Sequence, residues 1–481
     1  MRKIRLLECA LFMLLFMGHS AAYAFSDKVY DCQADATWFS SPTIPKEVAK
    51  SAPDGTSNFC DFYQFSWQAF AYLMSPVDGK AIRNFENTEK YYELEVKPDG
   101  TPENSCDNVK KGNTLFVRIR KSTDAGGLFA IPERIGQAGG GATIYDQQQN
   151  VVYYDVRFSQ NMCNVETIKS LDNFPSGTTE LKTAWKVLTK KDNTSQYITM
   201  DTVIGKQKTP TKLGMIGFHI AIATKDHPEF VWATFEHNVN APDCVAPQHL
   251  TGWSFASEMC TIDLAESNVL GVVQCRFNHP FPQKNPEHIT GSPTEICREY
   301  PYGSAPDDPH YDENIDDIIT LNANVQPFLT GSYAVLKNYF NLGAIWLSDI
   351  KKDSDLSNQR GSLRLANSVA ETDFQNVDLS SSFISNCFGC HNYTGTDNVQ
   401  SSKNTTSGNL SHIFDDITVG SGQCLDVQAN RTINSPSEAK ATCPTTCSGS
   451  SSLLKWNGQW TNQNAQSGAQ LPMSVCGCCG K

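Results

Sequence analysis

The motif Ser385-Asn-Cys-Phe-Gly-Cys-His391 is the most informative stretch of the chain. Cys-x-x-Cys-His is the attachment signature of a c-type haem. The thiols of Cys387 and Cys390 would add across the two haem vinyl groups, and His391 would be the proximal iron ligand. We therefore predict one covalent haem c held by these three residues.

Three other interpretations of the motif are a structural disulfide, a redox dithiol and half of a zinc site. A thioredoxin-like dithiol is expected within a βαβ pattern, whereas this motif lies in Ser- and Asn-rich sequence. A zinc site needs a second Cys or His pair at a defined interval, and none follows clearly. The residue pattern favours haem and leaves these alternatives open.

The N-terminus has the pattern of an exported protein. A basic start, Met1-Arg-Lys-Ile-Arg5, precedes a mostly apolar run to Met17 and the small-residue exit Ala22-Tyr-Ala24. This predicts a secretory signal peptide over residues 1–24, cleaved before Phe25. The run is too short for a good membrane span. We expect a periplasmic or secreted protein with no membrane span.

The charge of the mature chain limits its partners. Without residues 1–24, 36 Lys and Arg stand against 50 Asp and Glu, a formal charge of −14. This balance argues against nucleic acid or anionic lipid as a partner. It is compatible with a redox protein that meets a basic patch on a partner protein, whose identity the sequence does not give.

The cysteines divide into two even sets around the motif. Eight lie between the signal peptide and the motif, and six follow it: Cys32, Cys60, Cys106, Cys163, Cys244, Cys260, Cys275 and Cys297, then Cys424, Cys443, Cys447, Cys476, Cys478 and Cys479. Even sets suit disulfides in an oxidising compartment, although connectivity cannot be derived from sequence. We expect a haem domain over 25–417, with a disulfide-pinned connection at 241–310, and a second domain over 418–481.

The periodicity predicts an α+β fold: a large, β-rich mixed domain that bears the haem, then a small disulfide-rich β domain. Apolar residues at three- and four-residue spacing predict a core helix over Asp61–Met74, ended by Pro76, and another helix over Pro327–Phe340. Runs rich in β-branched and aromatic residues predict strands at Thr114–Arg120, Val151–Arg157, Glu180–Leu188 and Leu342–Leu347.

A β-hairpin is expected from Lys212–Thr224 and Phe230–His237, joined by a polar turn with a proline. If Thr224 faces Val231, then His219 pairs with Glu236.

In that register, Phe218 pairs with His237, so the two histidines lie on opposite faces and only one can point at a buried haem. His219 lies in the more apolar context and is our first candidate for a second metal ligand. Glu236 across the hairpin would orient its imidazole, as carboxylates do around metal-bound histidines.

The sixth iron position separates the possible roles of the haem. Two protein ligands favour electron transfer, whereas an open position beside a histidine favours catalysis. The alternative is therefore a haem enzyme of the peroxidase or oxidoreductase type, with His219 or His237 as distal acid/base and Glu236 as orienter. His412 is a further possible ligand. A third alternative is a glycan-binding adhesin whose haem is structural.

Several blocks of the large domain resemble a family of large exported bacterial cytochrome c-like proteins. The blocks are Phe65-Ser-Trp-Gln-Ala-Phe70, Glu180-Leu-Lys-Thr-Ala-Trp185, Gly217-Phe-His-Ile220, Val231-Trp-Ala-Thr-Phe-Glu-His237 and Leu365-Ala-Asn-Ser-Val-Ala-Glu-Thr372, ahead of the haem motif. The resemblance spans scattered parts of 55–417 and implies a monohaem protein. It supports Cys387, Cys390 and His391, and keeps His219, Glu236 and His237 as candidates.

The tail resembles a small mannan-binding lectin domain of microbial lectins. Its segments Cys443-Pro-Thr-Thr-Cys447, Lys455-Trp-Asn-Gly-Gln-Trp460 and Met473-Ser-Val-Cys-Gly-Cys478 carry the resemblance, which covers about 424–479. It implies a mannose-containing glycan as partner, because aromatic faces and amide donors suit sugar rings. The implied binding residues are Trp456, Asn457, Gly458, Trp460 and Met473. The alternative is a disulfide knob in which the tryptophans simply pack.

The sequence thus predicts an exported monohaem c-type cytochrome that transfers electrons and carries a C-terminal carbohydrate-binding module.

Overall fold

The structure of the chain is a computed structural model. It describes residues 32–87, 89–92, 142–162, 174–202, 209–270, 275–282, 291–381, 384–391, 393, 410–411, 424–450, 454–463 and 470–480. The predicted signal peptide, the predicted strand Thr114–Arg120 and His412 lie outside these residues.

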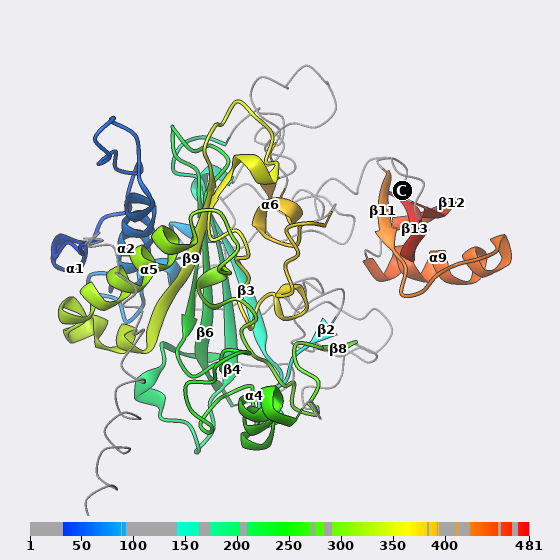
Figure 1. The fold of residues 1–481 in the computed structure, drawn as a ribbon, viewed down its shortest axis with the longest axis horizontal. Coiled ribbons are helices and arrows are strands. Elements are labelled where there is room, and N and C mark those ends of the chain that lie inside the picture. The colour runs from blue at the N-terminus through cyan, green and yellow to red at the C-terminus, as the bar shows by residue number, and fades with distance from the viewer. Residues whose placement is uncertain are drawn as a thin grey trace, which may run out of the picture. The chain divides into compact units, whose positions relative to one another are not determined.

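The body is built on one antiparallel sheet with strand order β1-β3-β4-β6-β7-β9-β10, in which β5 also pairs with β6 (Figure 1). The strands are β1 (Tyr91–Tyr92), β3 (Tyr153–Ser159), β4 (Thr179–Val187), β5 (Thr199–Thr202), β6 (Thr211–Ile222), β7 (Val231–His237), β9 (Tyr339–Leu347) and β10 (Gln359–Gly361). β2 (Ala142–Thr143) and β8 (Phe281–Pro282) pair separately. The strands expected near residues 151, 180 and 342 are confirmed.

One face of the sheet is covered by α2 (Phe59–Met74) and α5 (Tyr311–Asn324) (Figure 1). The predicted helix over Asp61–Met74 is confirmed, and Asn58 starts it through a capping box with Asp61. Its aromatic residues are core, since Phe70 stacks on Phe235 of β7 with 3.9 Å between ring centroids. The segment with the Cys-x-x-Cys-His motif packs on the opposite face of the sheet.

The helix predicted over Pro327–Phe340 is wrong. The chain forms two 3₁₀ segments, η6 (Gln326–Phe328) and η7 (Gly331–Asn338), and β9 already begins at Tyr339. Gly331 has a φ of 56°, a left-handed conformation that a continuous α-helix does not allow. The three-residue spacing of Tyr333 and Leu336 suits a 3₁₀ turn as well, because residues i and i+3 lie on one side of it.

The hairpin of β6 and β7 is confirmed, but its predicted register is wrong by two residues. Ile222 faces Val231, His219 faces Thr234, and Gly217 faces Glu236. The loop starts earlier than predicted because the Thr224 hydroxyl donates to the carboxylate of Glu47 at 2.5 Å and its amide donates to His227 O at 3.0 Å. A shift of two keeps each side chain on its predicted face.

Disulfides hold the segments outside the sheet. Cys244–Cys297 and Cys260–Cys275 pin the region 241–310, as predicted, although this region also contains the helix α4 (Glu258–Leu270). Cys32–Cys60 fastens the N-terminal segment to α2. All described disulfides join cysteines of the same predicted set.

The C-terminal part is a small disulfide-rich unit with a sheet of order β11-β13-β12 and one helix. Its elements are β11 (Cys424–Gln428), α9 (Pro436–Ser450), β12 (Leu454–Gln463) and β13 (Gln470–Gly480). Cys443 and Cys447 lie on one face of α9 and bond to Cys476 and Cys478, which share one face of β13. No helix in the described part of the chain is long and apolar enough to cross a membrane.

Candidate functional site

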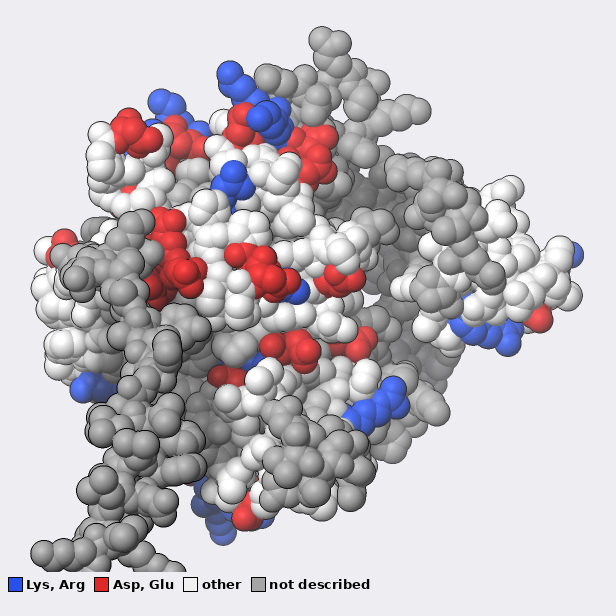
Figure 2. All heavy atoms as spheres, in the orientation of Figure 1, with Lys and Arg blue, Asp and Glu red and all other residues white. Residues whose placement is uncertain are grey.

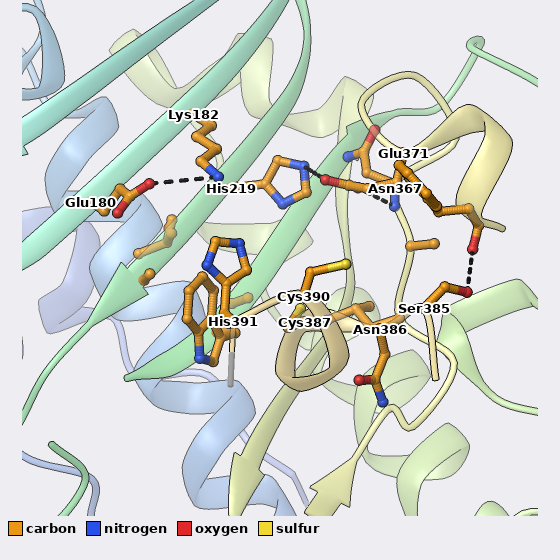
Figure 3. Close-up of a pocket in the computed structure, with 17 residues that line it drawn as sticks. Glu180, Lys182, His219, Asn367, Glu371, Ser385, Asn386, Cys387, Cys390 and His391 are labelled. Atoms are coloured by element: carbon orange, nitrogen blue, oxygen red, sulfur yellow. Dashed lines mark hydrogen bonds and ion pairs between the residues drawn. The ribbon is translucent and has the colours of Figure 1, made fainter. Parts of the chain in front are cut away.

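A pocket of about 660 Å³, including its open mouth, lies between the sheet and the segment that carries the motif. Its walls come from β4, β6, β7 and residues 365–391 (Figure 3). Cys387, Cys390, His391 and His219 all line it, so the structure brings together the predicted attachment residues and our first candidate for a second ligand.

The two motif cysteines are placed by α6 (Cys387–Cys390), a single helical turn. Residues three apart lie on the same side of a helix, so both thiols face the pocket (Figure 3). Asn386 caps this turn by accepting from the Gly389 amide at 3.0 Å, and its amide group donates to Gln359 Oε1 and Leu363 O at 2.7 and 2.8 Å. The residue before the first cysteine is therefore the one that anchors the turn to the body.

Among the cysteines whose side chains are described, Cys387 and Cys390 form no disulfide, whereas the others do. Burial, with a smaller effect of the Glu371 carboxylate, raises the pKa of both thiols above the ordinary value. Reactive dithiols and zinc ligands need thiolates, which a lowered pKa provides. The surroundings therefore favour the protonated form of both thiols and disfavour a reactive dithiol.

His391 is buried at the edge of the pocket and is held by two contacts. Its Nδ1 lies 2.8 Å from the carbonyl oxygen of Leu410, and its ring packs against Trp232 of β7. An Nδ1–H that donates to a carbonyl places the accepting lone pair on Nε2. This is the usual arrangement of a metal-binding histidine, whose other nitrogen is oriented by a backbone oxygen.

His219 projects from β6 into the same pocket beside Glu371 (Figure 3). Its Nε2 lies 3.2 Å from Glu371 Oε1, in a contact that lacks hydrogen-bond geometry. The second carboxylate oxygen of Glu371 accepts from the Asn367 amide at 2.8 Å. Glu371 could not be predicted from the sequence, because no local periodicity relates it to His219, which lies 152 residues earlier in the chain. The block Leu365–Thr372 contains it but does not indicate this contact.

Glu236 does not orient His219, so that expected contact is wrong. It is fully buried, lies 2.9 Å from Arg298 Nε and accepts the Ser368 amide. The reason is the true register of the hairpin, which puts Glu236 opposite Gly217. A buried carboxylate needs a charged and hydrogen-bonded partner, and Arg298 from the disulfide-pinned region provides it.

His237 lies outside the pocket. It is on the face of the sheet opposite to His219, as the hairpin prediction stated. Its ring stacks on Tyr197 with 4.2 Å between centroids, and its Nε2 and Nδ1 contact Gln196 O and the Val239 amide at 3.0 and 3.3 Å. Burial lowers its pKa to about 4. These contacts are those of a structural core histidine.

The β4 wall of the pocket is charged. Lys182 Nζ lies 3.5 Å from Glu180 Oε1, while Glu180 Oε2 accepts from the Ser411 hydroxyl at 2.7 Å (Figure 3). Together with Glu371, this wall gives the pocket a polar side, and Ala221, Trp232 and Leu365 give it an apolar one.

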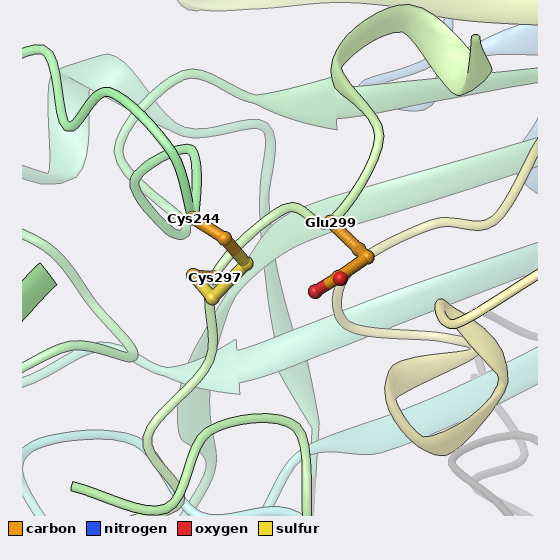
Figure 4. Close-up of side chains that lie close together, drawn as sticks. All are labelled: Cys244, Cys297 and Glu299. Atoms are coloured by element: carbon orange, nitrogen blue, oxygen red, sulfur yellow. A yellow bond between two sulfur atoms is a disulfide. The ribbon is translucent and has the colours of Figure 1, made fainter. Parts of the chain in front are cut away.

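A second cluster of potential metal ligands joins Cys244, Cys297 and Glu299 (Figure 4). The two sulfurs are bonded to each other, so no thiolate is left to bind a metal. Burial raises the pKa of Glu299, which further disfavours a charged ligand. This cluster is structural.

In the tail, Trp456 and Trp460 are half-buried against the disulfide core. The indole of Trp456 donates to Gln459 O at 2.7 Å, and Gly458 between the tryptophans has a φ of 89°. The β12–β13 register shifts between the tryptophans, so an irregular bulge separates them. Met473 is 40% exposed; the side chain of Asn457 lies outside the described residues.

Comparison with known proteins identifies only this tail. Residues 437–478 match the family of mannan-binding protein, over α9, β12 and most of β13. No curated protein and no solved structure shows significant similarity to the chain. The C-terminal part is thus similar to a mannan-binding domain, as its Cys-Pro and Trp-Asn-Gly segments predicted.

Proposed function

We propose that the protein is an exported monohaem c-type electron-transfer protein with a C-terminal mannan-binding module. One observation carries the haem assignment. Cys387 and Cys390 form no disulfide, whereas the other cysteines with described side chains do, and both line one pocket with His391.

The residues present fit a covalent haem. Cys387 and Cys390 would form the thioether bonds, and His391 would bind the iron through the nitrogen that does not face Leu410. When bound, the haem supplies one-electron redox chemistry, and the protein supplies its position and electrostatics. The apolar side of the pocket, from Ala221, Trp232 and Leu365, would exclude water from the porphyrin faces.

Electron transfer is favoured over catalysis by the position of His219. A histidine in the same pocket as the motif supports a second protein ligand, which leaves no open iron position for a substrate. The negative formal charge of −12 for the full sequence agrees with a partner that offers a basic surface. Figure 2 shows several separate acidic patches, with uncharged surface between them, on the face in view.

The mannan-binding module is supported by the family match at 437–478. Trp456, Trp460 and Met473 are the described residues that we assign to sugar contact, together with Gly458 in the bulge between the tryptophans. The paired cysteines suit an oxidising compartment, which agrees with the predicted signal peptide. We therefore place the haem domain outside the cytoplasm, where the module would attach it to mannose-containing glycans.

Expression of the full chain in a bacterial host with c-type haem attachment machinery tests the haem assignment. We expect haem staining of the denatured protein band, and loss of staining in the double variant C387S/C390S. S385A, which leaves the thiols in place, is the matched control and should stain like the wild type. A wild-type band that carries no covalent haem would overturn the proposal.

A further inference from the structure

We infer that Glu371 is a positioning residue for His219, and that the two together form the side of the pocket that supplies the second iron ligand. This inference rests on the proposed function, because it assumes that a haem is attached to the motif. It adds a residue that sequence analysis did not identify and corrects the role expected for Glu236.

The imidazole of His219 makes different contacts from those of three other histidines of the body. His227, His237 and His249 are each engaged by a hydrogen bond at Nδ1 or Nε2 and by a neighbouring aromatic ring. Within the described ranges, the polar contact of His219 is the one to Glu371, and its buried Nε2 makes no hydrogen bond. In this contact Nε2 faces the carboxylate, which leaves Nδ1 as the ring nitrogen that could bind a metal in the pocket.

The carboxylate of Glu371 is itself held in place from the sheet. Its Oε2 accepts the Asn367 amide, and the side chain of Asn367 donates to Thr234 Oγ1 at 2.9 Å. Thr234 is the residue directly opposite His219 in the hairpin. The contacts therefore run from His219 on β6 through Glu371 and Asn367 to Thr234 on β7. They hold the Glu371 carboxylate beside His219.

Glu236 supports the contact between Glu371 and His219 indirectly, through the loop that carries Glu371. By accepting the Ser368 amide, it holds the loop that carries both Asn367 and Glu371, and Arg298 in turn holds Glu236. Ligands that are fixed by such outer contacts keep their orientation when a metal binds. Glu236, which the sequence predicted beside His219, thus positions the loop that carries Glu371, the carboxylate that contacts His219.

A carboxylate beside an imidazole has two effects on a metal ligand. It fixes the tautomer, so that one ring nitrogen faces the carboxylate and the lone pair lies on the other, and it raises the basicity of the ring. A more basic axial ligand stabilises oxidised iron and lowers the reduction potential. We therefore expect Glu371 to affect the spectrum and potential of the attached haem, beyond any effect on folding.

The test compares the wild type with H219A, E371Q and E313Q, all as full-length haem-loaded protein. Glu313 is the matched control, because it lies 3.9 Å from His310 on the helix-covered side of the sheet, away from the pocket. We expect a low-spin visible spectrum for the wild type and a high-spin spectrum for H219A, restored to low-spin by added imidazole. E371Q should keep its haem and shift the reduction midpoint to more positive values, whereas E313Q should leave spectrum and midpoint unchanged.

The outcomes separate this inference from the proposed function. Absence of covalent haem in the wild type would defeat the proposed function. Haem present, with H219A and E371Q identical to the wild type in spectrum and midpoint, would overturn the inference alone. If H219A does not fold, the midpoint of E371Q decides, since glutamine keeps the size of the native side chain and one acceptor oxygen for the Asn367 amide.

Discussion

The imidazole of His391 packs against the indole of Trp232, with 4.5 Å between ring centroids and 36° between the ring planes. Trp232 is fixed in turn, because its Nε1 donates to the carbonyl oxygen of Glu229 at 3.1 Å. The last residue of the Cys-x-x-Cys-His motif therefore takes its position from β7, an inner strand of the sheet. The motif depends on a large domain rather than on a small fold of its own.

Replacing Trp232 by Ala should separate this support from general stability. Loss of the buried indole is expected to cost about 3–5 kcal/mol in the free energy of unfolding, measured by denaturant titration, and to lower haem absorbance per folded protein. W253A is the control, because Trp253 is equally buried but stacks on His249 outside the pocket. Equal haem content in the two variants would contradict a role of Trp232 in placing His391.

The cap of α6 predicts a defect in haem attachment. N386A removes the N-cap acceptor, worth about 1 kcal/mol, and leaves two buried carbonyl oxygens without their donor. We expect a lower fraction of haem-stained protein, because the turn that aligns the two thiols loses its anchor. N58A removes the cap of α2 on the other side of the sheet and should reduce stability while haem attachment stays normal. The idea fails if both variants stain alike.

Gly389, inside the motif, gives a sharper test of the same turn. A Cβ at this position would overlap the backbone carbonyl oxygen of Ile384, so G389A requires the backbone to move. We expect covalent haem to fall to a small fraction of the wild-type level, measured by haem stain against total protein. G449A is the control, because an added Cβ there meets no atom within 4 Å.

The parts of this molecule that could be predicted are those that short stretches determine. The capped aromatic helix α2 and the hairpin β6–β7 follow from local patterns and are confirmed, whereas the haem expected from the Cys-x-x-Cys-His spacing stays a prediction. The helix α5 was missed because its Asp- and Asn-rich sequence hides the buried residues Ile318 and Leu321. The hairpin register failed because a distant carboxylate, Glu47, holds its turn.

In the candidate site, too, some residues follow from local sequence and others depend on distant contacts. Cys387, Cys390 and His391 could be named from their spacing, whereas the partner of His219 depends on which loop the sheet places above it. Glu371 and Glu236 are both carboxylates close to the hairpin, and only the register decides which of them reaches the imidazole.

His237 predicts a pH dependence of stability. Its pKa in the folded protein is lowered from 6.5 to about 4 by burial, so the unfolded chain binds a proton more readily between these values. Stability is therefore complete above pH 6.5 and falls as the pH drops toward 4, by roughly 3 kcal/mol from this residue. H237Q should flatten the pH dependence of the unfolding free energy in this window. H249Q, at an exposed histidine, should not.

The tail predicts retention of the full chain on immobilised mannan. W460A removes a half-buried aromatic face that packs on the disulfide core, so it tests sugar contact and packing together. M473A removes a side chain that is 40% exposed and therefore tests sugar contact with little effect on the core. We expect the wild type to be retained and released by free mannose, with weaker retention for M473A and least for W460A.

V245A, at an exposed apolar residue of the large domain, is the control and should bind like the wild type. Passage of the correctly folded wild type through the column unretained would contradict the glycan-binding role and leave the tail as a disulfide-stabilised unit whose tryptophans serve packing alone.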